Sequence, residues 1–191
     1  DVSELNGLPV RVVASPSIEA GNDLLRAILL QGKSIIASKI LEAAGNYAAN
    51  DVLSGSAAAG TGTAWYFANC ARAPGRSFMI TGIRMRYAAD SVLFRPEIHF
   101  FRRNPTASEL DDNAAYSMAA ADNLGSSLGA FPLPAFTDLG PESVTSDDDI
   151  RKQITPAIND TGVYAIVKTL DAEANETAGA RLEVELEIIQ Y

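Results

Sequence analysis

Two short stretches of the sequence match parts of catalytic or nucleotide-binding motifs. GSSLG at 125–129 has the G-x-S-x-G spacing that places a nucleophilic serine on a sharp turn. That chemistry needs a histidine later in the chain, whereas the single histidine, His99, comes earlier. GKS at 32–34 matches the end of a phosphate-binding loop, but Ala27 stands where the pattern requires its first glycine. We therefore interpret 125–129 as a loop and 32–34 as a polar turn.

Metal and acid–base sites have equally little support in the sequence. A zinc site needs several His or Cys ligands, and the chain has one of each, His99 and Cys70. We expect His99 to be a partly exposed strand residue and Cys70 to be a small buried apolar group. The acidic clusters at 111–113 and 147–149 lack the spacing of a calcium loop, so we interpret them as solvated loops. We predict no metal, no cofactor and no catalytic residue.

Two further groups of side chains suit binding rather than catalysis. Tyr47, Trp65, Tyr66 and Phe67 could form a platform on which sugar rings stack, but aromatic residues on a strand also build cores and subunit interfaces. The pair Arg102-Arg103 could contact an acidic partner, or could simply be solvated at a strand end. A hydrolase with paired carboxylates stays open, because nothing in the spacing of the 24 acidic residues singles out a pair.

The composition bounds the class of protein. A chain of 191 residues with 47% hydrophobic and 20% charged residues is globular and can bury a real core. The net charge of −9 makes nucleic acid a poor partner, because phosphate binding needs excess Lys and Arg. One cysteine excludes an intrachain disulfide and fits a reducing cytoplasm. No apolar run approaches a membrane span and no signal peptide is visible, so we expect no membrane partner.

The first 38 residues differ from the rest, and we divide the chain into an N-terminal arm, 1–38, and a domain, 39–191. Asn22 or Asp23 could cap one short helix in the arm. The apolar face of this helix either packs on its own domain or contacts a neighbouring subunit. Its residues, which we take as candidate partner contacts together with Arg102 and Arg103, are Leu24, Leu25, Ile28 and Leu29.

From residue 39 onward the pattern is that of β-strands. In RLEVELEI at 181–188, apolar and charged residues alternate, as expected of an antiparallel strand with one solvated face. In the segment at 76–89 the alternation changes parity at Thr81-Gly82, which predicts a bulge or bend at Gly82. Further strands are expected at 38–43, 63–71, 94–101, 128–133, 149–158 and 163–171, and an acidic loop at 137–149. The predicted fold is mainly β, an antiparallel jelly-roll-like β-sandwich with a helical N-terminal extension.

The stretch EIHFFRRNPTASELDDNAAYSM at 97–118 runs from an apolar strand into polar residues. Ile98 and Phe100 share the face of the strand that should enter the core. The strand ends at Asn104-Pro105, because proline cannot donate to the ladder. The polar residues that follow can satisfy backbone groups of a long loop, so the stretch needs no catalysis to explain it. These residues are Thr106, Ser108, Asp112 and Asn113.

Two motifs, in this order, resemble those of a group of tailed-bacteriophage structural proteins. The first is a Y-x-A-x-D-V segment followed by glycine, and the second is F-x-x-N-P-T-x-S-x-x-x-D-N-A. The matching residues are Tyr47, Ala49, Asp51, Val52 and Gly55 for the first, and Phe101, Asn104, Pro105, Thr106, Ser108, Asp112, Asn113 and Ala114 for the second. The resemblance covers 39–191 and leaves out the N-terminal segment.

The resemblance implies a virion setting. Small β proteins of that setting are similar to capsid decoration or cement proteins, which often form homotrimers on the head shell. The expectation is therefore a non-enzymatic protein that is assembled in the host cytoplasm, binds the major capsid protein and stabilises the expanded shell by linkage. A carbohydrate-binding module of a tail or fibre is the alternative, and exposure of Trp65 and Tyr66 on a flat face distinguishes it from decoration.

Overall fold

The structure is a computed structural model that describes residues 31–42, 46–174 and 178–191. The chain divides into two compact units, Asp1–Gln31 and Gly32–Tyr191, and the described residues belong almost entirely to the second. The predicted N-terminal helix, with Leu24, Leu25, Ile28 and Leu29, lies outside the described residues. No described helix has the length and apolar character needed to cross a membrane.

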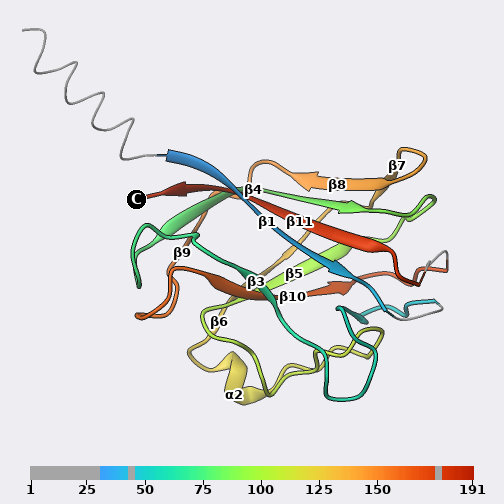
Figure 1. The fold of residues 1–191 in the computed structure, drawn as a ribbon, viewed down its shortest axis with the longest axis horizontal. Coiled ribbons are helices and arrows are strands. Elements are labelled where there is room, and N and C mark those ends of the chain that lie inside the picture. The colour runs from blue at the N-terminus through green and yellow to red at the C-terminus, as the bar shows by residue number, and fades with distance from the viewer. Residues whose placement is uncertain (1–30, 43–45, 175–177) are drawn as a thin grey trace, which may run out of the picture. The chain divides into compact units, whose positions relative to one another are not determined.

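Two β-sheets form the second unit (Figure 1). The first sheet has the order β1 (Gln31–Ile40), β11 (Arg181–Gln190), β4 (Phe78–Tyr87), β8 (Ser143–Asp147), β7 (Thr137–Asp138), and β9 (Lys152–Ile154) also pairs with β4. The second has the order β2 (Val52–Leu53), β10 (Val163–Thr169), β5 (Pro96–Phe101), β6 (Ser127–Pro132), and β3 (Trp65–Phe67) also pairs with β10. Every resolved register is antiparallel, and the one described helix is α2 (Ala120–Asn123).

The order of the strands identifies the fold. Apart from β3 and β9, which pair outside the main order of each sheet, and the terminal strand β7, eight strands remain, four in each sheet. Numbered along the chain, they are arranged 1-8-3-6 in one sheet and 2-7-4-5 in the other. This is the strand order of a jelly roll, in which the chain crosses between the sheets at every step except one hairpin, here β5–β6. The predicted jelly-roll-like β-sandwich is confirmed.

The core lies between the two sheets and follows from the alternation of each strand. In β11 the apolar residues Leu182, Val184, Leu186 and Ile188 are buried, while charged residues between them face solvent. Burying each such side chain contributes roughly 1.5–3 kcal/mol. In the pairing of β11 with β4, Thr81 is an extra residue, because Glu187 faces Gly82 and Ile188 faces Ile80. The bulge predicted at Thr81-Gly82 is therefore confirmed.

The prediction of an acidic loop at 137–149 is wrong, because this segment contains β7 and β8. Strand β8 pairs with β4 over five residues and occupies an inner position of the first sheet. Its two buried residues are polar. The hydroxyl of Ser143 donates to the carbonyl of Ala89 at 3.0 Å, and that of Thr145 donates to the carbonyl of Pro134 at 2.8 Å. With hydroxyls on the inner face, the strand lacks the apolar alternation that would have revealed it.

Strand β1 also begins earlier than expected. It starts at Gln31, so the expected arm, 1–38, overlaps a strand of the first sheet. The polar turn assigned to 32–34 is wrong, because these residues continue β1. Ile35 and Ala37 pack against the core, which explains why the segment pairs with β11 despite its serine and lysine content.

Candidate functional site

The second of the two sequence motifs, at 101–114, lies mainly in the loop 102–126 that joins β5 to β6. This β5–β6 loop carries α2 and covers the outer side of the second sheet (Figure 1). Its apolar residues Leu110, Tyr116 and Met118 pack on a small second cluster of Val52, Phe101 and Ile166. The loop therefore has an apolar core of its own, and three aspartates hold its backbone.

Asp112 connects the loop to three other parts of the chain. Its side chain is 3% exposed. Oδ1 accepts hydrogen bonds from the Tyr47 hydroxyl and the Ser54 backbone N–H, both at 2.8 Å, and Oδ2 accepts one from the Glu42 N–H at 2.9 Å. Tyr47 belongs to the first motif and Asp112 to the second, so this contact joins the two motifs in space. Asp112 does satisfy backbone groups as predicted, but these belong to Ser54 and Glu42 rather than to the loop itself.

Asp111 binds three consecutive backbone N–H groups of the neighbouring loop. Its carboxylate accepts from Gly60 at 2.6 Å, from Thr61 at 3.0 Å and from Gly62 at 2.7 Å. The N–H groups of Gly60 and then Gly62 are the main causes that hold the pKa of Asp111 below its usual range. A Cβ on Gly62 would lie 1.9 Å from the carbonyl oxygen of Leu110, so only glycine fits this approach. The interpretation of 111–113 as a solvated loop is wrong for both aspartates, which are buried.

Asp122 closes the loop upon itself. Its Oδ2 accepts hydrogen bonds from the N–H groups of Ala107 and Ser108 and from the Ser108 hydroxyl, at 2.7–2.9 Å. The Ser108 oxygen in turn accepts from the Ala119 N–H at 3.0 Å. Asn113 takes a left-handed backbone with φ of 60°, which asparagine tolerates better than most residues. Within the described residues, no group of three or more His, Cys, Asp or Glu side chains is arranged to hold a metal.

His99 lies beneath this loop and is buried, at 8% exposed, so the expectation of a partly exposed residue is wrong. Its ring stacks on Phe101, its Nε2 lies 2.8 Å from the Ser127 hydroxyl, and its Nδ1 lies 3.1 Å from the Tyr116 hydroxyl. The structure thus brings the single histidine to the central serine of the G-x-S-x-G match, which chain order did not suggest. The group at Nδ1 is a phenol rather than the carboxylate of a Ser-His-Asp triad.

Burial lowers the pKa of His99 below its ordinary value of 6.5. Because the unfolded chain then binds more protons than the folded one, we expect stability to fall as the pH drops below about 6.5. Above that pH the histidine is neutral in both states and contributes no pH dependence. Urea unfolding at pH 7.5 and 5.5 should show a larger loss of stability for the wild type than for His99→Gln. An equal loss in both proteins would contradict this prediction.

Of the interpretations left open for the four aromatic residues, burial in the core is confirmed for three of them. Tyr47, Trp65 and Phe67 are buried in the core, with Trp65 only 1% exposed. The indole N–H of Trp65 donates to the carbonyl of Leu53 at 2.9 Å. Tyr66 alone is exposed, at 42%, with its ring 4.7 Å from that of Tyr164. The platform interpretation is therefore wrong for Trp65, since alternate residues of β3 point to opposite faces of the sheet.

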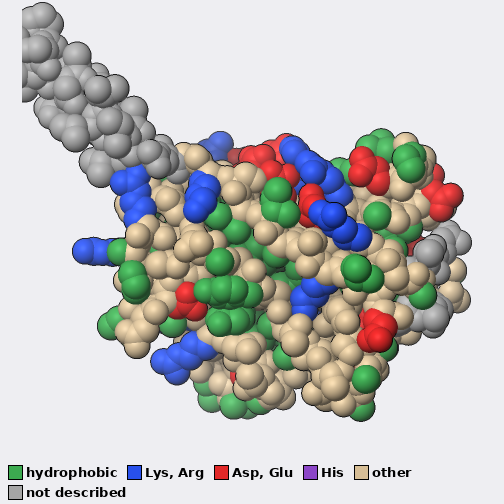
Figure 2. Space-filling view, in the orientation of Figure 1, with side chains coloured by type: hydrophobic (Ala, Val, Ile, Leu, Met, Phe, Trp, Pro, Cys, Tyr) green, Lys and Arg blue, Asp and Glu red, His purple; other side chains and the backbone are tan. Residues whose placement is uncertain are grey.

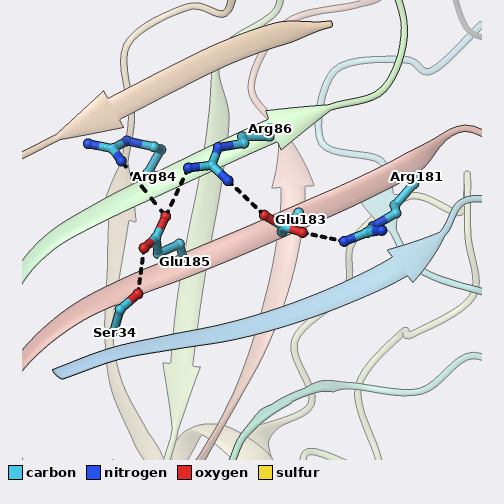
Figure 3. Close-up of polar contacts among 6 residues, drawn as sticks. All are labelled: Ser34, Arg84, Arg86, Arg181, Glu183 and Glu185. Atoms are coloured by element: carbon cyan, nitrogen blue, oxygen red, sulfur yellow. Dashed lines mark hydrogen bonds and ion pairs between the residues drawn. The ribbon is translucent and has the colours of Figure 1, made fainter.

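The solvated face of the first sheet carries a ladder of opposite charges. Figure 2 shows acidic and basic side chains intermixed over β4 and β11, and Figure 3 shows their contacts. Arg86 bridges Glu183 at 3.1 Å and Glu185 at 3.3 Å, and Arg84 approaches Glu185 at 3.8 Å. Such exposed pairs are worth about 1 kcal/mol or less each. The opposite charges on this face are paired with one another, so little net charge is left to attract a partner.

Arg102 and Arg103 differ from these paired arginines. Their backbone N–H groups bind the Ser126 carbonyl and hydroxyl at 2.7 and 3.2 Å, which fixes the end of β5. In the described part of the chain neither side chain forms an ion pair, and Nε of Arg102 is buried without a hydrogen-bond partner. Leu124, two residues from Ser126, is 79% exposed. We call Arg102, Arg103 and Leu124 the arginine patch.

Comparison with known proteins gives only weak structural matches. No protein-family model and no curated protein matches the chain. Three solved virus structures are weakly similar. Mud crab tombus-like virus has 14% identity over 84% of this chain and 80% of that chain, with a TM-score of 0.29. Macrobrachium rosenbergii nodavirus particles give 12% identity, coverages of 84% and 91%, and a TM-score of 0.29. A marine algae virus of the order Picornavirales has 9% identity over 85% of this chain and 69% of that chain, with a TM-score of 0.21.

These likenesses concern the fold alone, and TM-scores of this size do not establish a common fold. The assignment to a class rests on the strand order of the chain itself, which is that of a jelly-roll β-sandwich. Within that class, the particular features of this chain are the aspartate-held β5–β6 loop and the arginine patch beside it.

Proposed function

We propose that the protein is a non-enzymatic virion structural protein, and specifically a decoration protein that binds the expanded head shell of a tailed bacteriophage. The observation that carries the proposal is that the two motifs shared with phage structural proteins meet at Asp112. There they join the β5–β6 loop to the rest of a jelly roll. The shared motifs thus serve the scaffold, and the resemblance is one of architecture.

The polar groups that could have served catalysis are used by the fold. Asp111, Asp112 and Asp122 each accept three hydrogen bonds from backbone or hydroxyl donors. His99 is buried beneath the β5–β6 loop with hydroxyl partners on both nitrogens. Carboxylates and imidazoles held in this way stabilise a loop and are poorly placed to exchange protons with a substrate. This supports the non-enzymatic part of the proposal.

The arginine patch supplies the shell-facing contact in this proposal. Arginine is enriched in the centres of protein interfaces, where its five N–H groups bind carboxylates. The Nε of Arg102 is already removed from water, so burying it at an interface costs little further hydration. Leu124 is exposed and would add apolar surface to such a contact. A protein that binds only the expanded shell stabilises that state by its binding free energy. If it also forms oligomers, several contacts bind the shell at once and the overall affinity rises.

Co-sedimentation tests the proposal directly. Purified protein is mixed with expanded shells of the source phage that lack it, and with unexpanded procapsids as the control. Saturable binding to the expanded shells alone is the expected result. Binding to neither form would overturn decoration and favour the tail or fibre alternative. Glycan screening would then follow, with Tyr66→Ala as its test variant, because Tyr66 is the exposed member of the aromatic group.

Reversing the charge of the arginine patch should weaken shell binding about 30-fold or more, as expected when central interface arginines are lost. The variant is Arg102→Glu with Arg103→Glu. Its matched control is Arg76→Glu with Arg151→Glu, which changes the net charge equally at exposed positions outside the patch. Circular dichroism should show that both variants are folded. Equal weakening in both would indicate a general effect of charge, and an unchanged patch variant would show that the patch is not the contact.

A further inference from the structure

The outer edge of the first sheet is formed by β1, which is ten residues long (Figure 1, blue). Among the strands that the structure describes, none pairs with its other side. The remaining edge strands are shorter: β2 and β7 have two residues each and β6 has six. A long open edge offers a row of unpaired backbone donors and acceptors to another strand.

The hydrogen bonds at the end of β1 show which backbone groups face this open edge. Leu41 donates to the carbonyl of Ala180 at 2.9 Å and accepts from the N–H of Gly179 at 2.8 Å. Both polar groups of Leu41 therefore point toward the side of β11. In an antiparallel strand this direction alternates with each residue. The N–H and C=O groups of Ser34, Ile36, Ser38 and Ile40 consequently point to the open side.

The side chains of the same four residues lie on the solvated face, since Ile35 and Ala37 pack against the core. Ile36 is 55% exposed and Ile40 is 62% exposed. The Ser34 hydroxyl donates to Glu185 at 2.5 Å, which ties β1 to β11 (Figure 3). Among the described residues, the open edge thus combines backbone groups that no described strand pairs with two exposed isoleucines and no acidic side chain. Near its end, Gly55 lies close to the carbonyl of Ile40.

We propose that a second copy of this chain pairs with the open edge, β1 against β1 in antiparallel orientation, with Ser38 on the two-fold axis. In this register Ile36 of each copy faces Ile40 of the other. Three pairs of residues then exchange about six backbone hydrogen bonds. The two isoleucine pairs lie on one face of the joined sheets and cover apolar surface that is now exposed.

The alternative registers are less favourable. If Ile36 lay on the axis, Lys33 of each copy would face Lys39 of the other, and like charges directly opposite are destabilising. If Ala37 lay on the axis, both isoleucines would face serines, and no apolar pair would form. Pairing about Ser38 avoids both costs, because Lys39 then faces Ala37 and each Ile36 faces an Ile40. Of these three registers, only the one about Ser38 pairs both exposed isoleucines with isoleucine without placing lysines opposite each other.

Lys39 does not protect this edge, although lysine on an edge strand often prevents pairing. Its ammonium group donates to the Thr63 hydroxyl at 2.8 Å and lies 5.6 Å from the centre of the Trp65 ring. The charge is therefore held on the inner side of the strand. The inference does not depend on the proposed function, because the association concerns the purified chain without shells.

Sedimentation of the full chain is expected to give a species of twice 20.2 kDa at micromolar concentration. Ser38→Pro removes an N–H on the open side, and Ile36→Lys places charges within the isoleucine pairs. Each should raise the dissociation constant at least tenfold. Ile158→Lys is the matched control, since Ile158 is 81% exposed and lies outside β1, and it should leave association unchanged. A monomer, a trimer, or a dimer insensitive to both β1 variants would overturn the proposal.

A disulfide tests the register and does not depend on the strength of association. Hydrogen-bonded residues opposite each other lie about 5.5 Å apart between Cα atoms, within the range for a disulfide. Under oxidising conditions Ser38→Cys should therefore cross-link two copies of the chain. Ile36→Cys should not, because it would face Ile40. The native Cys70 is buried and does not interfere. Cross-linking through position 36 and not 38 would contradict the register proposed.

Discussion

Replacing Asp112 with alanine should lower the free energy of unfolding by about 3–5 kcal/mol, because a buried carboxylate with several donors would be lost. The change leaves the Tyr47 hydroxyl and the N–H groups of Ser54 and Glu42 without their acceptor. Because Asp112 is only 3% exposed, bulk solvent does not reach these donors in the folded protein. The effect should be large because these donors come from three separate segments that Asp112 holds together.

Urea unfolding followed by circular dichroism measures this effect. Asp112→Asn keeps the shape and one acceptor oxygen, so its loss should be smaller than that of Asp112→Ala. Asp148→Ala removes an exposed carboxylate, and its effect should stay within about 0.5 kcal/mol. If Asp112→Ala and Asp148→Ala destabilise the protein equally, the carboxylate does not hold the motifs together.

The parts of the fold that the sequence predicted are those in which each strand has one apolar face. Leu182 to Ile188 alternate without exception, and the structure buries the expected set. The same holds for Ile98 and Phe100 of β5, and the change of parity at Thr81 located the bulge. In these strands the burial of apolar surface dominates the free energy, so the local pattern and the tertiary structure agree.

The failures arose where polar side chains find partners far away in the chain. Strand β8 was missed because Ser143 and Thr145 satisfy their hydroxyls with carbonyls of other segments. His99 was expected to be partly exposed, because nothing in the local sequence reveals that the β5–β6 loop covers it. Hydrogen bonds between residues distant in sequence leave no periodic signal, and only the topology brings their partners together.

The candidate site was predicted in part. The two adjacent arginines at the end of β5 were visible as a candidate contact, but the buried Nε of Arg102 and the exposure of Leu124 were not. The open edge of β1 escaped detection for a different reason. Residues 32–34 were interpreted as a polar turn and a strand was expected only from residue 38, because the pairing of this segment with β11 leaves no signal in the local sequence.

Trp65→Ala should destabilise the protein by about 3–5 kcal/mol, since it empties a large buried volume and removes the donor of the Leu53 carbonyl. Tyr66→Ala is the matched control, one residue along the same strand. Because Tyr66 is 42% exposed and its main ring contact is Tyr164, its loss should stay below about 1.5 kcal/mol. Far-UV circular dichroism is the readout, because the variant lacks the single tryptophan. The reverse order would mean that Trp65 faces solvent, and would restore the sugar-binding platform as an interpretation of this strand.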